Sequence, residues 1–273
     1  MRRALLGCLL LSLSSAPVGV FLILRRMSLS GDAISHAILP GTAIGFAFAG
    51  LSVFAMTLGG LIAGALVVAL SGAVSRNTRT SEESTLAAFY LSSMALGVMI
   101  ISLRGDGVDL LHFLFGSVLA LDDPTLYLLF ICAAITLLLG SVIYRPLVLE
   151  CSDPEFFSSI SRSGAICHTA FLLLVVLNLV AGFYALGTLM SVGLLILPGV
   201  TARCWSRQLE PMLLLAAGFS FTACALGLLA SFYFSLATSS SIVLCAAIFY
   251  FISIFVGTAS TWRNRAPVAA SLK

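Results

Sequence analysis

Residues 211–233, PMLLLAAGFSFTACALGLLASFY, carry no charged side chain and are long enough to cross a lipid bilayer as one helix. A helical span needs about 20 apolar residues to cross a hydrocarbon core of roughly 30 Å. The apolar residues run continuously and do not alternate with period two, which favours a helix over a strand of a membrane barrel. This stretch therefore predicts a transmembrane helix.

The rest of the chain has the same character, with 60% hydrophobic residues, 9% charged residues and a mean hydropathy of +1.13. A soluble domain carries about 25% charged residues. We predict an all-α polytopic membrane protein with eight or nine transmembrane helices in a single transmembrane domain over residues 1–273. The candidate spans are 4–24, 33–50, 52–74, 86–103, 124–144, 165–185, 187–202, 211–233 and 240–258. The run 110–121 is too short to cross and is expected to form an interfacial or re-entrant helix.

The first apolar run follows Arg2 and Arg3, as a signal peptide would. It continues for about 20 residues without a convincing cleavage site, so we expect a retained first span. Arginines lie in the breaks at 25–31, 75–85, 145–164 and 203–210, and the positive-inside rule predicts these breaks to be cytoplasmic. Nine spans would then place the N-terminus outside.

Small residues predict how tightly the spans pack. Gly41 and Gly45, and likewise Gly60 and Gly64, have the four-residue spacing that lets helix backbones approach closely in lipid. The seven cysteines form no C-x-x-C pair and are expected to pack as small hydrophobic residues.

Two ionisable residues, Asp32 and His36, stand at the head of the second predicted span. Residues four apart share a helix face, with Cβ atoms about 5–6 Å apart. Ionisable groups are costly within a span and are functional candidates there. A carboxylate and an imidazole suit Zn, Mn or Fe(II) more than Cu(I). Two ligands make an incomplete site, which fits a passage that must release its ion.

Pro40 follows this pair and is expected to disturb the helix, because its ring clashes with the carbonyl group of His36. The residues alone leave an alternative open, in which Asp32 caps the helix and His36 forms a hydrogen bond to a neighbouring helix. The other candidate residues have ordinary explanations. We expect packing at the membrane interface for His112 and His168, and charges favoured at a helix N-terminus for Glu82 and Glu83.

The stretch that contains Asp32 and His36 also carries a resemblance. Residues 24–41, LRRMSLSGDAISHAILPG, read like the signature LRRMSLxGDALSHAVLPG of the ABC-3 type permeases, the membrane subunits of ABC importers for zinc, manganese or iron(II). Supporting motifs occur in the order of that family: SEEST at 81–85 and ALG at 95–97, LFG at 114–116, DPEF at 153–156, GTL at 187–189 and LPGVTA at 197–202. The resemblance extends from about residue 3 to residue 258.

The resemblance implies a fold like that of the vitamin B12 (type II) importers and a place in the bacterial inner membrane. It implies a second permease copy, with a homodimer expected, two cytoplasmic ATPase subunits and an extracytoplasmic solute-binding protein. It also implies that Asp32 and His36 coordinate the transported Zn²⁺, Mn²⁺ or Fe²⁺, with no permanently bound cofactor. Residues 153–164, an amphipathic stretch, would correspond to the coupling helix that docks on the ATPase.

The sequence predicts a non-enzymatic chain, because it contains no nucleotide-binding GxxxxGK[ST] loop, no HExxH and no GxSxG. ATP hydrolysis would therefore belong to a partner chain. Two other functions stay open at this level: a stand-alone secondary metal-ion carrier and a structural or receptor-like scaffold. Such carriers usually show inverted repeats or several intramembrane ionisable residues, and neither feature is clear here.

Overall fold

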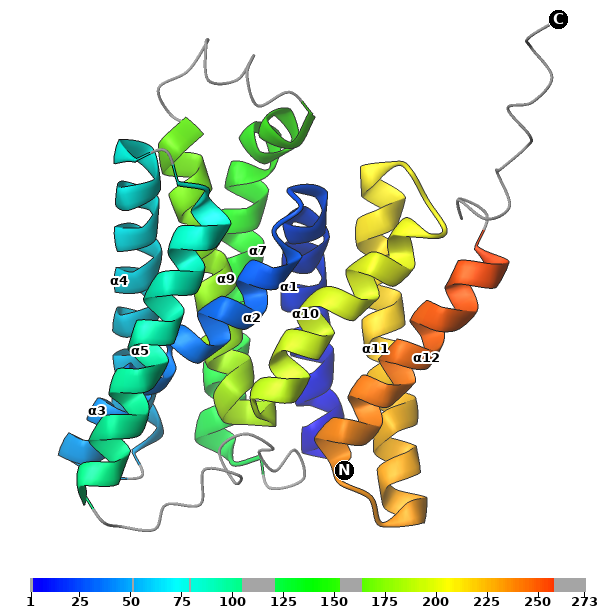
Figure 1. Ribbon diagram of the computed structural model, residues 1–273. Helices are drawn as coiled ribbons and strands as arrows, with labels where there is room; N and C mark the ends of the chain where they lie inside the picture. The colour runs from blue at the N-terminus through cyan, green and yellow to red at the C-terminus, as the bar shows by residue number, and fades with distance from the viewer. Residues whose placement is uncertain (1, 51, 79, 105–120, 153–163, 258–273) are drawn as a thin grey trace, which may run out of the picture.

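The computed structural model describes residues 2–50, 52–78, 80–104, 121–152 and 164–257. The regular elements of these residues are all helices, and they form one bundle of roughly parallel rods (Figure 1). The helices are α1 (Arg2–Leu24), α2 (Ser28–Ala37), α3 (Leu39–Ala49), α4 (Val53–Asn77), α5 (Glu82–Arg104), α7 (Asp123–Ser152), α9 (Gly164–Leu186), α10 (Thr188–Arg203), α11 (Leu209–Phe234) and α12 (Thr238–Val256).

These helices correspond one to one with the nine predicted spans, with α2 and α3 together making the second traverse. Six of them, α1, α4, α7, α9, α11 and α12, are individually long and apolar enough to cross a membrane. The shorter α10 is also apolar. Except for Leu121 and Gly164, the short helix expected at 110–121 and the stretch 153–164 lie outside the described residues.

The span predicted at 124–144 is longer in the structure, where α7 continues to Ser152 through Arg145 and Pro146. The charge of Arg145 predicts the end of the span. Its side chain is exposed on the outside of the helix, where a long side chain can carry its charge toward the membrane surface. Pro146 removes one backbone hydrogen bond without ending the helix.

Helices α1 and α9 occupy the centre of the bundle. In each of them 72% of the most apolar window is buried, compared with 22% in α7 and 28% in α4 and α12. One core cluster surrounds Leu11 of α1 in the half of the bundle near the N-terminus, and a second surrounds Leu22 in the other half. This packing fits a retained first span. Cys8, Cys132 and Cys224 are buried in the first cluster, as expected for cysteines that act as small apolar side chains.

The predicted close approach of glycine-rich helices is present between α3 and α4. A Cβ atom on Gly41 would lie 2.1 Å from the carbonyl oxygen of Gly59, and one on Gly45 would lie 2.6 Å from that of Ala55. No side chain fits at these distances. The two backbones therefore touch, and α3 is held beside α4 as an antiparallel hairpin at one edge of the bundle (Figure 1).

The arginines mark one face of the bundle as cytoplasmic. The face at the top of Figure 1, where α1, α4, α7 and α10 end, carries six arginines of the described residues: Arg25, Arg26, Arg76, Arg145, Arg203 and Arg207. The opposite face, where the N-terminus lies, carries Arg2 and Arg3, and α5 ends there at Arg104. The positive-inside rule assigns the first face to the cytoplasm.

Candidate metal site at the interrupted helix

The second traverse is interrupted at Ile38, two residues before Pro40, as the proline predicted. Helix α5 supports the interruption. Ser93 Oγ of α5 donates a hydrogen bond of 2.9 Å to the carbonyl oxygen of Ala37, the last residue of α2. Gly97 lets α5 come this close, because a Cβ atom there would lie 3.0 Å from the nitrogen of Pro40. Helix α5 therefore packs directly against the break.

Asp32 and His36 lie together on α2, one turn before this break. His36 Nε2 is 3.7 Å from Asp32 Oδ1, too far for a hydrogen bond and close enough for both atoms to contact one cation. The Asp32 side chain is 60% exposed and that of His36 is 27% exposed. The pair therefore presents one oxygen and one nitrogen toward the outside of the chain at membrane depth.

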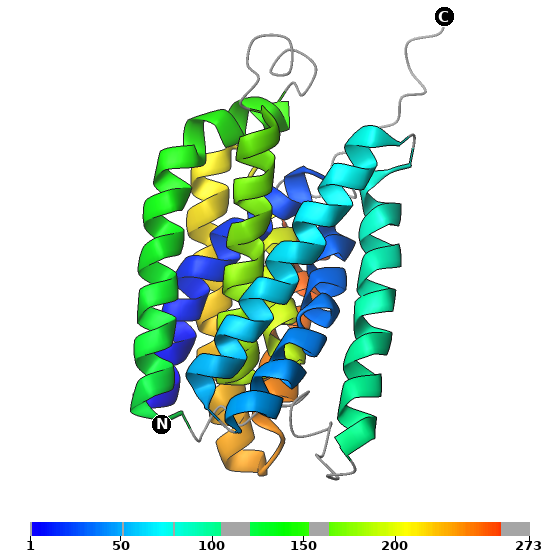
Figure 2. The ribbon, with the colours of Figure 1, turned by 90° about the vertical axis from the view of Figure 1, so that its left-hand side faces the viewer.

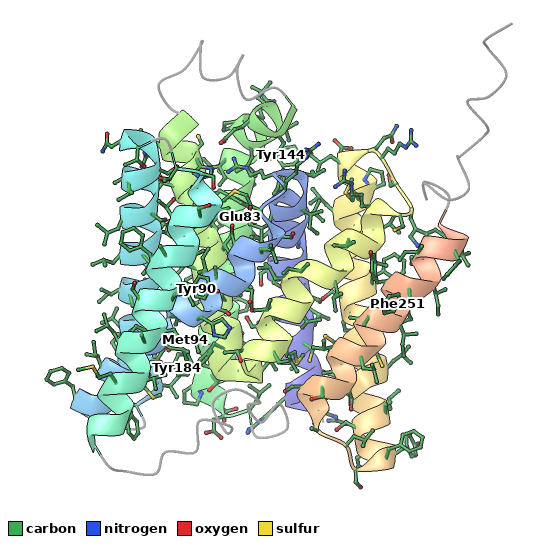
Figure 3. All side chains as sticks on the ribbon, viewed as in Figure 1. Glu83, Tyr90, Met94, Tyr144, Tyr184 and Phe251 are labelled. Atoms are coloured by element: carbon green, nitrogen blue, oxygen red, sulfur yellow. The ribbon has the colours of Figure 1, made fainter. Side chains whose placement is uncertain are left out.

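The environment of His36 leaves its ring free for a ligand. Nδ1 is buried without a hydrogen-bond partner among the described residues. The ring lies beside Tyr90 of α5, with ring centroids 6.2 Å apart, and Figure 3 shows Tyr90 where α5 passes α2. Nδ1 is therefore enclosed by packing, and Nε2, which faces Asp32, is the ring nitrogen that a cation would contact.

The structure rules out the capping alternative for Asp32. Helix α2 begins at Ser28, with Met27 in the N-cap position, so Asp32 lies in its second turn. The described residues also contain no hydrogen bond from His36 to a neighbouring helix. No third His, Cys, Asp or Glu of the described residues completes a metal-binding group. Among the described residues of one chain, the pair remains a set of two ligands.

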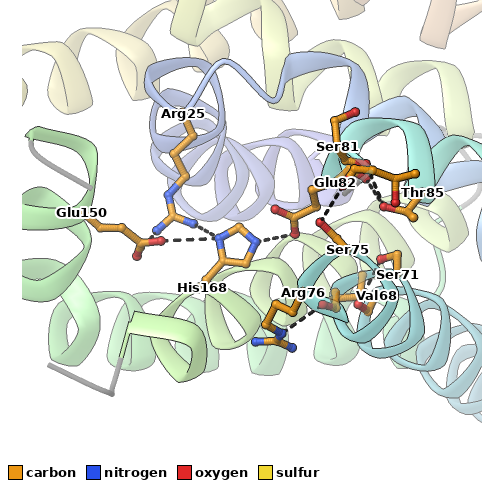
Figure 4. A network of polar contacts seen from close by, with 12 residues as sticks. Arg25, Val68, Ser71, Ser75, Arg76, Ser81, Glu82, Thr85, Glu150 and His168 are labelled. Carbon is orange, nitrogen blue, oxygen red and sulfur yellow. Dashed lines mark hydrogen bonds and ion pairs between the residues drawn. The ribbon is translucent and has the colours of Figure 1, made fainter. Parts of the chain in front are cut away.

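A second ionisable cluster lies at the cytoplasmic end of the bundle, and the sequence did not reveal it (Figure 4). Arg25 Nη2 donates to Glu150 Oε2 at 2.5 Å, and Arg25 Nη1 lies 2.7 Å from His168 Nδ1. His168 Nε2 lies 2.5 Å from Glu82 Oε1. The four residues come from the region after α1 and from α7, α9 and α5, so they connect four segments that are distant in sequence.

Both ring nitrogens of His168 have charged neighbours. Nδ1 lies 2.7 Å from Arg25 Nη1 and 3.5 Å from Glu150 Oε1. A guanidinium group can only donate hydrogen bonds, so the shorter contact favours Nδ1 as an acceptor and Nε2 as the donor to Glu82. The Arg25 side chain is 6% exposed and stacks over the ring of Phe171, with Cζ 4.7 Å from the centroid. Glu150 is 18% exposed. A charge buried to this extent requires a partner of opposite charge, and Arg25 and Glu150 provide one for each other.

This cluster changes the interpretation of two residues. His168, expected to pack at the interface, is instead a hydrogen-bonded bridge between a cation and a carboxylate. Glu82 lies in the first turn of α5, as expected, and also accepts the proton of that bridge. Arg25 and Glu150 are 125 residues apart, and no spacing rule in the sequence connects them.

The bundle of long apolar helices defines the chain as a multi-pass membrane protein. The chain belongs to the ABC 3 transport family, whose model matches residues 1–257. The resemblance expected from the motifs is thereby confirmed, as are the type II importer-like fold and the place in the bacterial cell membrane.

Relatives of known description match most of the chain. The manganese transport system membrane protein MntC of Halalkalibacterium halodurans is 36% identical over 256 residues, which is 93% of this chain and 86% of the relative. The chelated iron transport system membrane protein YfeD of Yersinia pestis is 30% identical, over 93% of this chain and 84% of the relative. The solved structure of PsaBC from Streptococcus pneumoniae in complex with Fab matches with a TM-score of 0.83 and 32% identity, over 94% of this chain and 92% of that one.

Proposed function

We propose that the chain is the membrane subunit of an ATP-driven importer that moves Mn²⁺, or a closely related divalent cation such as Fe²⁺, into the cytoplasm. Family membership supports ATP-binding cassette transport over a stand-alone carrier. The names of the relatives describe manganese and chelated iron, so they support these two metals and give zinc no specific support. The Asp32–His36 pair carries the proposal, because it offers a hard oxygen and an imidazole nitrogen at membrane depth.

The exposed pair also supports the expectation of a second copy. Two ligands bind a cation weakly, whereas two copies that face one another would supply two carboxylates and two imidazoles. Asp32 is exposed in the single chain, so its carboxylate is available to such a partner. A set of four ligands made by two chains can open when the chains separate, and that property suits release of the ion. Metal selection would then depend on the partner chains as well as on these four groups.

The metal and the two residues are tested by uptake in cells. A strain that lacks its own manganese importer receives the wild-type chain with its ATPase and solute-binding protein, and accumulation of ⁵⁴Mn, ⁵⁵Fe and ⁶⁵Zn is measured. We expect cells with the wild-type chain to accumulate ⁵⁴Mn or ⁵⁵Fe. Asp32→Ala and His36→Ala should each abolish this accumulation. Asp123→Asn is the matched control, since Asp123 is 61% exposed and pairs with Arg3. It lies at the opposite end of α7 from the ion cluster formed by Arg25, Glu82, Glu150 and His168. Wild-type accumulation in both alanine variants would remove the pair from the function.

The alternative of a stand-alone carrier predicts a different result. The purified chain alone, in vesicles with an imposed metal or proton gradient, would then move the metal without ATP or an ATPase. The importer predicts no transport by the chain alone, transport when the ATPase is present with ATP, and co-purification of the two proteins. ATP-independent transport at a comparable rate would contradict the proposal.

A further inference from the structure

A cavity of about 460 Å³ opens on the side of the bundle between α1, α7, α9 and α11. This volume lies within the range of ligand sites, roughly 300–1,000 Å³. Leu13, Leu137, Leu174 and Leu213 are among its lining residues, together with the small residues Gly140 and Ala217. Leu137 and the lining residue Leu214 are exposed, so the cavity opens sideways and not into the interior. We call it the lateral groove.

The lateral groove is apolar even where its walls carry hydroxyl groups. Ser14, Thr136 and Ser141 line it, and each donates its hydroxyl proton to a carbonyl oxygen of its own helix: Leu11, Cys132 and Leu137, respectively. Hydroxyl groups that are already bonded offer little to a polar ligand or to water. The walls therefore match a hydrocarbon occupant.

The depth of the lateral groove corresponds to one leaflet of the bilayer. Its lining on α7 runs from Thr136 to Leu147, about 17 Å at 1.5 Å per residue, compared with roughly 15 Å for half of the hydrocarbon core. At its cytoplasmic end, Phe21 lies edge-on to Tyr144 and Phe171, with ring centroids 6.1 Å and 6.4 Å away. Figure 3 shows Tyr144 near that end of α7, where an amphipathic ring meets the headgroups.

The lateral groove also lies away from the candidate metal site. Helix α7 and helix α5 stand on opposite sides of the bundle (Figure 2), and the metal-site pair lies on α2, which packs on α5. A second copy that shares the metal would cover the side of α2 and α5. The groove then faces the bilayer, where an empty apolar cavity would forgo the dispersion contacts that a chain of methylenes provides.

We propose that the lateral groove binds one acyl chain of a phospholipid from the cytoplasmic leaflet. The chain lies along α7, and its headgroup stays at the level of Tyr144. A bound chain replaces the helix contact that α7 lacks here, and it supports the aromatic wall whose Phe171 stacks on Arg25 of the ion cluster. The bilayer-facing position of the groove rests on the proposed pairing of two copies at α2 and α5, whereas binding of the acyl chain is measured without any metal.

Gly140→Leu tests the proposal by filling the groove. A Cβ atom on Gly140 meets no other atom within 4 Å, so the larger side chain enters open space, and leucine favours a helix more than glycine does. Gly218→Leu is the matched control, because Gly218 also faces open space, on α11, and does not line the groove. Ala217→Phe fills the groove from the opposite wall and provides a second variant.

The full chain is placed in vesicles of phosphatidylethanolamine and phosphatidylglycerol with a trace of phosphatidylglycerol that carries a diazirine in the middle of one acyl chain. After illumination, labelled residues are mapped by mass spectrometry. We expect label on the groove walls of the wild type and of Gly218→Leu, and about tenfold less in the two filled variants, which corresponds to ~1.4 kcal/mol of lost binding. Equal labelling in all four proteins would overturn the proposal. So would a wild type whose groove walls carry no label while other lipid-facing residues are labelled, because the groove would then be closed to acyl chains.

Discussion

Replacing Arg25 with methionine is expected to destabilise the protein by about 3–5 kcal/mol, because it leaves a buried carboxylate without its cation. Arg25 is 6% exposed and donates to Glu150, which is 18% exposed. Methionine keeps most of the length of the side chain and its contact with Phe171, but no guanidinium group. His168 also loses the donor to Nδ1. The loss should therefore exceed that of an ordinary surface ion pair, about 0–1 kcal/mol.

The neighbouring arginine is the control. Arg26 is exposed and has no ion pair among the described residues, so Arg26→Met should change stability by no more than about 0.5 kcal/mol. Unfolding of the purified proteins is followed by tryptophan fluorescence during titration of mixed micelles with sodium dodecyl sulfate. The double variant Arg25→Met with Glu150→Gln removes both charges and should be about 1–3 kcal/mol more stable than the sum of the single effects.

Two outcomes would refute this reasoning. If Arg25→Met loses no more stability than Arg26→Met, the cluster does not hold the cytoplasmic ends of the helices together. If the double variant loses the sum of the two single effects, Arg25 and Glu150 act independently, and the 2.5 Å contact between them has no energetic weight.

Two further predictions concern the packing around the interrupted helix. Gly41→Leu should prevent accumulation of monodisperse protein, because a Cβ atom at this position already lies 2.1 Å from the carbonyl oxygen of Gly59. Gly218→Leu is the control and should behave as the wild type. Equal yields of the two variants on size-exclusion chromatography would contradict the packing of α3 on α4. Ser93→Ala should lower the free energy of unfolding by about 1–3 kcal/mol, because the Ala37 carbonyl group loses its hydrogen-bond donor. The dodecyl sulfate titration described above measures this loss. A change below about 0.3 kcal/mol would show that the hydrogen bond does not stabilise the protein.

The sequence predicted eight or nine helical traverses and their order because a bilayer imposes a length and a composition on each span. It also predicted the interruption near Pro40 and the proximity of Asp32 and His36, since both follow from the geometry of one helix. These features are local. The metal role of the pair came from residue chemistry and from the family motif, and it stays a prediction that the uptake experiments test.

Features that depend on contacts between distant helices could not be predicted in this way. The ion cluster joins Arg25 to Glu150 and His168 across more than a hundred residues, and each member has an ordinary explanation in its own segment. Ser93 reads as a small polar residue within a span, and only the packing of α5 on α2 gives it a role. The lateral groove likewise exists only where four helices meet.

The central claim is that Asp32 and His36 bind the metal during ATP-driven passage. The most direct test is ATP-dependent uptake of ⁵⁴Mn²⁺ into vesicles that contain the complete importer with wild-type, Asp32→Ala, His36→Ala or Asp123→Asn permease. ATP hydrolysis in the same vesicles shows whether each complex is assembled. We expect Asp32→Ala and His36→Ala to lose uptake while their complexes still hydrolyse ATP, and Asp123→Asn to retain both activities. Wild-type uptake by Asp32→Ala and His36→Ala would contradict it.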